Sequence, residues 1–138
     1  MFFLAFLFLP FQLMAEAVDN RSAVKIPAKF KPQVLADMRK NLEVIQGIVA
    51  ALAKEDFEVA AKTASILGRM DHTDEVMQRR KFMPEGFRKL GPQMHMGFQA
   101  LARDARDFED IQHSLEQLSK IMSTCTACHQ SYRLEVTD

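Results

Sequence analysis

The chain lacks tryptophan, has only two cysteines among its 138 residues, and shows no excess of charge of either sign. Because 18 lysines and arginines balance 18 aspartates and glutamates, there is no overall basic field for nucleic acid and no acidic field for basic partners. The sequence also lacks internal repeats and low-complexity segments. The length fits one modest domain, so any partner must be recognised locally.

No apolar run reaches the roughly 18 continuous residues expected of a membrane-spanning helix. The longest, residues 2–15, reads FFLAFLFLPFQLMA and is followed by Ala15-Glu16-Ala17, a suitable cleavage pattern for a secretory signal peptide. A basic segment before the run is missing, so an uncleaved membrane anchor is the alternative. We expect residues 1–17 to be a signal peptide and residues 18–138 to be a single exported domain.

Export changes how the two cysteines are interpreted. They lie in the string Cys125-Thr126-Ala127-Cys128-His129. A C-x-x-C-H pentapeptide is the attachment signature of a c-type haem, in which both thiols form thioethers with the haem and the adjoining histidine binds iron. Two thiols one helical turn apart can hold one edge of the macrocycle. The motif predicts one covalent haem c, with His129 as the proximal iron ligand.

Three other interpretations of the cysteine pair compete with haem attachment. A thioredoxin-like pair should lie near a βαβ pattern at the start of a helix, whereas this pair lies ten residues from the C-terminus. A zinc site would need further ligands, and His72, His95 and His113 are scattered singly. A disulfide closing so short a loop would add little stability and would not need His129.

Helical periodicity runs through residues 18–138, and no alternating strand pattern is evident. Residues 18–30 are interpreted as a leader segment before the first helix, and Pro32 suits the first turn of that helix. Asp56 is a plausible N-cap of a second helix, and residues 69–91 read as a long connection in which 73–80 forms a short helix. A third helix is expected to begin at Gly91-Pro92 and to end in the charged stretch 103–107.

The most regular segment is the last one, where apolar and motif residues recur every three or four positions. These residues are Phe108, Ile111, Leu115, Leu118, Met122, Cys125, His129 and Tyr132. Such a stripe predicts a helix that turns Cys125 and His129 toward the protein interior. The pattern as a whole predicts an all-α protein, an antiparallel up-down-up-down four-helix bundle that encloses the covalent haem.

The opposite face of the haem has one candidate ligand on the first helix. Val34, Met38, Leu42, Ile45, Val49 and Leu52 form a second apolar stripe there. In antiparallel helices Met38 and His129 would lie at the same end of the bundle, so the Met38 thioether could bind the iron face opposite His129. Methionine is also a common core residue, so packing alone is the alternative for Met38. His95 is a weaker candidate for the same position.

The string Cys125 to Arg133, with an aromatic and a basic residue after C-x-x-C-H, resembles the C-terminal end of the cytochrome c prime family. The resemblance extends to Met38, to Lys54-Glu55-Asp56-Phe57 before an alanine-rich segment, and to Phe82-Met83-Pro84-Glu85-Gly86. It implies a bacterial periplasmic four-helix cytochrome that is not an enzyme, exchanges electrons with redox partner proteins, and can form a homodimer. Nucleic acid is not an expected partner, and a membrane is expected only if residues 1–17 stay attached.

Two subclasses of this family differ at the position that matches Met38. In the five-coordinate members a non-ligating side chain shields the iron, and these proteins bind nitric oxide or carbon monoxide. In the low-spin cytochrome c-556 type a methionine completes the coordination and the protein transfers electrons. The resemblance therefore implies His129/Met38 ligation and electron transfer, with gas binding as the alternative. It also implies that Arg133 meets a haem propionate or tunes the potential; a helix-end cation is the other interpretation of Arg133.

Overall fold

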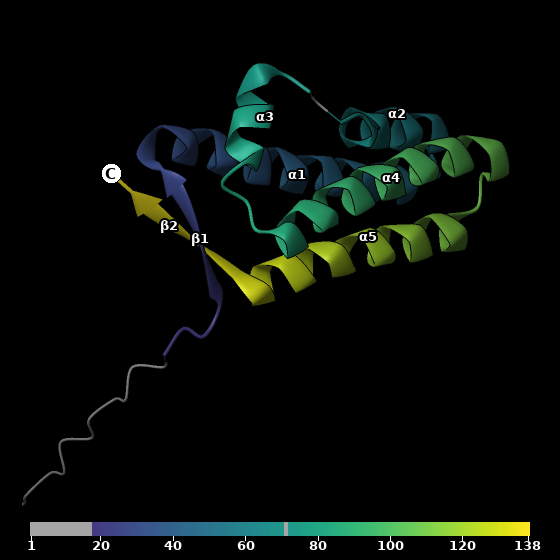
Figure 1. Ribbon diagram of the computed structural model, residues 1–138. Coiled ribbons are helices and arrows are strands. Elements are labelled where there is room, and N and C mark those ends of the chain that lie inside the picture. The colour runs from purple at the N-terminus through teal and green to yellow at the C-terminus, as the bar shows by residue number, and fades with distance from the viewer. Residues whose placement is uncertain (1–17, 71) are drawn as a thin grey trace, which may run out of the picture.

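The computed structural model describes residues 18–70 and 72–138, which are mostly helical (Figure 1). Within these residues the elements, in order, are β1 (Ser22–Pro27), a 3-10 turn (Ala28–Phe30), α1 (Lys31–Leu52), α2 (Phe57–Gly68), α3 (Asp74–Arg80), α4 (Glu85–Phe108), α5 (Ile111–Ser131) and β2 (Tyr132–Thr137). The predicted signal peptide, residues 1–17, lies outside the described residues. None of the described helices combines the length and the apolar character that crossing a membrane requires.

A small parallel sheet joins the two ends of the described chain. β1 pairs with β2 from Ser22 opposite Tyr132 to Pro27 opposite Thr137. The expectation of a simple leader over residues 18–30, with no strands, was therefore wrong. Val24 and Ile26 of β1 are almost fully buried, because they pack with Phe30, Val34 and Met83 in a small second core. The sheet thus ties the beginning of α1 to the segment that follows the cysteine motif (Figure 1).

The first two long helices begin and end where local signals predicted. Pro32 lies in the first turn of α1, where its missing N–H costs nothing. Asp56 is the N-cap of α2, and its carboxylate accepts a hydrogen bond of 3.0 Å from the Val59 backbone N–H. Alanines 60, 61 and 64 form the buried face of α2. Small side chains there allow α2 to approach α1 and α4 closely.

The expected third helix was misplaced at both ends. α4 begins at Glu85, directly after Pro84, and passes through Gly91 and Pro92 without ending. The charged stretch 103–107 continues the helix to Phe108, since Asp104 and Ala105 are buried while their charged neighbours face solvent. Packing of one face of α4 against α2 and α5 outweighs the local helix-breaking residues. The short helix predicted at 73–80 is present as α3.

The buried face of α5 coincides with the predicted stripe only at Leu118. Its buried residues are Ser114, Leu118 and Ile121, whereas Leu115 and Met122 are each 44% exposed. In α1 the predicted residues Val34 and Leu52 are buried, but Val44 and Ile48 are buried where Leu42, 67% exposed, was expected. A three-four spacing is compatible with two neighbouring faces of one helix, and tertiary contacts cover a face that only partly coincides with each predicted stripe.

The main core lies where α2 and α4, α4 and α5, and α1 and α2 pack together. Phe98 and Leu101 of α4 are fully buried at its centre. α2 and α4 run antiparallel: Glu58 near the start of α2 contacts Arg106 near the end of α4, and Leu67 near the end of α2 contacts His95. α1 and α5, in contrast, contact each other at few points.

The closest approach of α4 to α5 depends on Gly97. A Cβ added there would lie 2.7 Å from Cγ1 of Ile121, closer than packed atoms allow. We expect Gly97→Ala to lower the free energy of unfolding by about 1–3 kcal/mol in a urea titration. Gly91→Ala is the matched control, because an added Cβ there meets nothing within 4 Å and alanine is the better helix former. A Gly97→Ala variant as stable as Gly91→Ala would contradict the close approach.

A buried carboxylate also connects α4 to α5. Asp104 accepts hydrogen bonds from Arg103 (2.7 Å) and Gln117 (2.5 Å), and His113 Nε2 lies 3.5 Å away. Burial by itself would raise the pKa of Asp104, but these hydrogen bonds outweigh it and the pKa lies below its ordinary value of 3.8.

A depressed pKa in the folded state predicts a defined pH dependence of stability. The contribution of Asp104 is complete above the pKa of the unfolded chain and is lost as the pH falls through the lower, folded-state pKa. We expect Asp104→Asn to be less stable than the parent at pH 7 and the difference to shrink at acid pH. Urea titrations at a series of pH values check this, with the exposed Asp107→Asn as control. A difference independent of pH would refute the role assigned to Asp104.

Candidate functional site

The cysteine motif occupies the last two turns of α5. Cys125 and Cys128 are both free thiols and about half-buried, one helical turn apart. Burial raises the pKa of Cys125, although a hydrogen bond with the backbone opposes this slightly. Burial, followed by the nearness of Cys125, raises the pKa of Cys128. Both groups are therefore neutral thiols at pH 7, and the Cys125 thiol lies 3.7 Å from the Ile121 carbonyl oxygen.

These properties bear on the competing interpretations of the cysteine pair. Thiol exchange needs a thiolate, which proteins generate by lowering the pKa at a helix N-terminus or beside a cation. Here the thiols lie at the C-terminal end of α5 and their pKa values are raised. A zinc site finds no support, because no group of three or more His, Cys, Asp or Glu suited to a metal ion occurs in residues 18–70 and 72–138.

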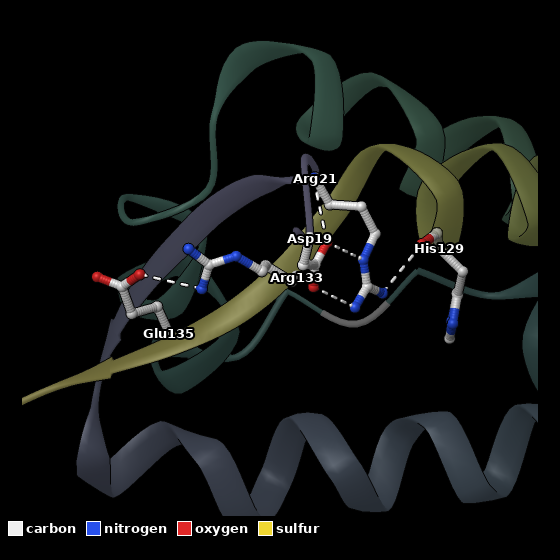
Figure 2. A network of polar contacts seen from close by, with 5 residues as sticks. All are labelled: Asp19, Arg21, His129, Arg133 and Glu135. Atoms are coloured by element: carbon white, nitrogen blue, oxygen red, sulfur yellow. Dashed lines mark hydrogen bonds and ion pairs between the residues drawn. The ribbon is translucent and has the colours of Figure 1, made fainter. Parts of the chain in front are cut away.

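The surroundings of His129 differ from those of His95 and His113. His95 is hydrogen-bonded to a carbonyl, and His113 lies beside Asp104. The His129 residue is exposed, and its ring makes no hydrogen bond or ion pair within the described part of the chain. In the view of Figure 2 the ring extends away from the strands, on the side of α5 where α1 runs. The prediction that His129 points into the protein interior was wrong, and the ring nitrogens are available to a ligand.

The backbone of His129 is held by the other end of the chain. Arg21, just before β1, donates a hydrogen bond of 3.2 Å to the His129 carbonyl oxygen (Figure 2). The guanidinium is itself oriented by Asp19, at 2.8 and 2.9 Å. The Arg21 side chain lowers the pKa of Asp19 to about 2. The carbonyl is one of the last four of α5, which lack partners inside the helix.

Arg133 does not continue the motif helix. It lies on β2, where it pairs with Ala23 of β1, and its guanidinium contacts Glu135 at 3.1 Å. In Figure 2 it lies apart from His129. Arg133 therefore lies beyond the helix that carries the cysteine motif, because α5 ends at Ser131. This side chain is engaged by a carboxylate within its own strand.

Met38 lines a large cavity that the motif residues do not line. The cavity encloses about 550 Å³ between α1, α3, α4 and the end of α2. Met38 is 37% exposed on its wall, near Asp37, which forms a 2.7 Å ion pair with Arg79 of α3. Cys125, Cys128 and His129 are absent from this wall. The predicted distal ligand thus lines a cavity whose wall does not include the predicted proximal ligand.

A second hollow follows the seam between α1 and α5. It is a shallow groove with Val49 of α1 on one side and Leu115, Leu118 and Met122 of α5 on the other. Most of these residues belong to the two stripes that were predicted to be buried and are instead substantially exposed. The helices leave apolar side chains uncovered along the seam that leads toward the cysteine motif.

Sequence patterns missed two features of the site. The first is Arg21, whose role depends on the pairing of β1 with β2; the alternation of Val24 and Ile26 with Lys25 was the available signal. The second is the cavity beside Met38, which no local pattern describes. In comparisons with known proteins, no family model, no curated protein and no solved structure matches this chain.

Proposed function

We propose that this protein is a periplasmic c-type cytochrome that transfers electrons between redox partner proteins. In this proposal residues 18–138 form an antiparallel four-helix bundle around one haem, bonded to Cys125 and Cys128. His129 is the proximal iron ligand and Met38 the distal ligand. The observation that carries the proposal is the C-x-x-C-H sequence on α5, with two free, neutral, half-buried thiols and an adjoining imidazole that has no partner among the described residues.

The residues present fit the attachment half of such a site. The thiols lie one turn apart on a single helix, and no disulfide consumes them. The imidazole beside them makes no competing hydrogen bond in the described residues, and Arg21 holds its backbone. The uncovered apolar seam between α1 and α5 supports the proposal further, because a large apolar group held at this end of α5 would cover side chains that now face solvent.

Each residue of the proposed site has one role in this mechanism. When bound, haem supplies an iron that cycles between the ferric and ferrous states. Cys125 and Cys128 would prevent its loss through two thioether bonds. His129 would bind iron through a ring nitrogen, while Arg21 and Asp19 hold the end of α5 that carries it. The soft sulfur of Met38 would favour the reduced state. No residue forms a bond with a substrate, so the activity is not enzymatic.

One observation favours a second candidate function. Met38 lies on a cavity wall that contains none of the motif residues. If this separation persists in the loaded protein, the iron face opposite His129 stays open. The protein would then be a five-coordinate cytochrome that binds nitric oxide or carbon monoxide.

The absorption spectrum of the purified, haem-loaded protein distinguishes the two functions. We expect a low-spin spectrum and no rapid binding of carbon monoxide by the reduced protein, because Met38 occupies the distal position. Replacing Met38 with alanine should produce high-spin iron that binds carbon monoxide. Met96→Ala is the matched control, since this exposed methionine of α4 does not line the cavity. A high-spin spectrum of the parent, unchanged in Met38→Ala, would establish the gas-binding alternative instead.

A further inference from the structure

The cavity between α1, α3, α4 and the end of α2 has a positively charged wall. Its basic residues are Lys40, Arg69, Arg79, Arg80 and Arg88. Among the described residues only two acids, Asp37 and Glu75, lie on the same wall, so five positive charges face two negative ones. The chain as a whole has equal numbers of basic and acidic residues, so this excess is local. A concave surface with an excess of one charge concentrates ligands of the opposite charge.

Arg79 of α3 has one terminal nitrogen in use and one without a partner. Its Nη2 forms the 2.7 Å ion pair with Asp37 of α1, and the side chain is only 14% exposed. Its Nη1 is buried and finds no hydrogen-bond acceptor in the part of the chain that the structure describes. Buried donors in folded proteins nearly always have an acceptor, so this one indicates that an acceptor from outside the chain is missing.

The chemistry of a guanidinium favours a carboxylate as that acceptor. The N–H groups of arginine form a planar fork that matches the two oxygens of a carboxylate. Because Nη1 is covered in this conformation, a rotation of the long Arg79 side chain must bring it to the ligand oxygen. The ion pair with Asp37 keeps the guanidinium on the cavity wall while leaving this second donor unused.

Apolar side chains form much of the remaining wall. Five methionines line it: Met38, Met70, Met77, Met83 and Met94. Met70 and Met77 are 44% and 47% exposed, and Ile66 on the same wall is 46% exposed. These side chains would gain by being covered with an apolar group. The cavity volume of about 550 Å³ lies within the range of small-molecule sites, which is about 300–1,000 Å³.

We propose that this cavity binds a small organic carboxylate with an apolar body, such as a medium-chain fatty acid. The carboxylate lies at Arg79, and the apolar body covers the methionine-lined part of the wall. An inorganic anion would leave the apolar side chains uncovered, and an uncharged apolar molecule would leave the cations and the buried donor without an acceptor. The site needs no contact with Met38, which the proposed function assigns to the haem iron.

Isothermal titration calorimetry of the purified full chain with sodium octanoate at pH 7 tests the site. We expect one octanoate to bind per chain. Sodium acetate lacks the apolar body and should bind at least about tenfold more weakly. The neutral analogue 1-octanol lacks the charge and should also bind at least about tenfold more weakly. Equal binding of octanoate and 1-octanol, or of octanoate and acetate, would overturn the proposal.

A pair of variants separates the loss of the cation from the loss of its ion pair. Arg79→Gln removes the guanidinium and should weaken octanoate binding at least about tenfold. Asp37→Asn breaks the same ion pair but keeps Arg79, so octanoate should bind at least as tightly as to the parent. Lys120→Gln on α5 is the control for overall charge, because Lys120 is exposed and does not line the cavity. Equal weakening by Arg79→Gln and Asp37→Asn would refute the role of Arg79.

A further arm distinguishes this proposal from the haem proposal. The Cys125→Ser/Cys128→Ser double variant lacks both attachment thiols, and neither cysteine lines the cavity. We expect it to bind octanoate as the parent does, with the same sensitivity to Arg79→Gln. A parent protein that binds octanoate but carries no covalent haem would refute the proposed function alone. A haem-carrying parent that binds no octanoate would refute the carboxylate site alone.

Discussion

We expect replacement of both Cys125 and Cys128 with serine to abolish the proposed covalent attachment of haem. Each thiol would form one thioether, and serine hydroxyls cannot replace them. Denatured parent protein, produced by cells that attach haem to c-type cytochromes, should retain one haem by intact-mass measurement. The denatured double variant should retain none. The expected change is complete, because denaturation releases every haem held only by coordination or packing.

Thr126→Ala is the matched control for this experiment, since it alters an exposed position between the two cysteines without removing a thiol. This variant should carry as much haem as the parent. Parent protein without covalent haem would refute the proposed function outright. His129→Ala separates covalent attachment from iron binding. We expect this variant to keep the covalent haem but to have a changed visible spectrum, because the imidazole that binds iron is missing.

Replacing Phe98 with alanine should cause the largest loss of stability in the helical core. Phe98 is fully buried in α4, among residues contributed by α1, α2 and α5. Removing its ring leaves a cavity that neighbouring helices fill only partly, so we expect the free energy of unfolding to fall by about 3–5 kcal/mol. Urea titration followed by far-ultraviolet circular dichroism measures the change.

Phe108→Ala is the matched control on the same helix, because Phe108 is 63% exposed. Its effect should stay within about 0.5 kcal/mol. Equal losses from the two substitutions would contradict the burial of Phe98. This comparison also tests the correction to α5, because the predicted stripe included Phe108 as a buried residue, whereas the structure exposes it.

Helix starts that depend on local signals were predictable from the sequence, whereas a start that depends on packing was not. The N-cap at Asp56 and the proline at the start of α1 act through hydrogen bonds and sterics within one turn, so the sequence alone located both. The start of α4 at Glu85 was missed because Gly91 and Pro92 are locally unfavourable in a helix, and only packing against α2 and α5 compensates for them.

The residues of the candidate site also differ in how far the sequence alone could predict them. Cys125, Cys128 and His129 could be named without a structure, because their chemistry depends on covalent spacing along five residues. Met38 and Arg133 depend on tertiary placement. Met38 lies on a cavity wall that the motif residues do not line, and Arg133 lies on β2, where it forms an ion pair with Glu135 of the same strand.

The sequence by itself determined the helical class and the position of the C-x-x-C-H motif, because both follow from local composition and spacing. Only the tertiary structure decided that β1 pairs with β2, that Arg21 holds the His129 carbonyl, and which faces of α1 and α5 are covered. The physical reason is that periodicity identifies an apolar face but not its partner, and burial requires a partner. The cavity lined by five methionines likewise arises only when helices distant in the sequence come together.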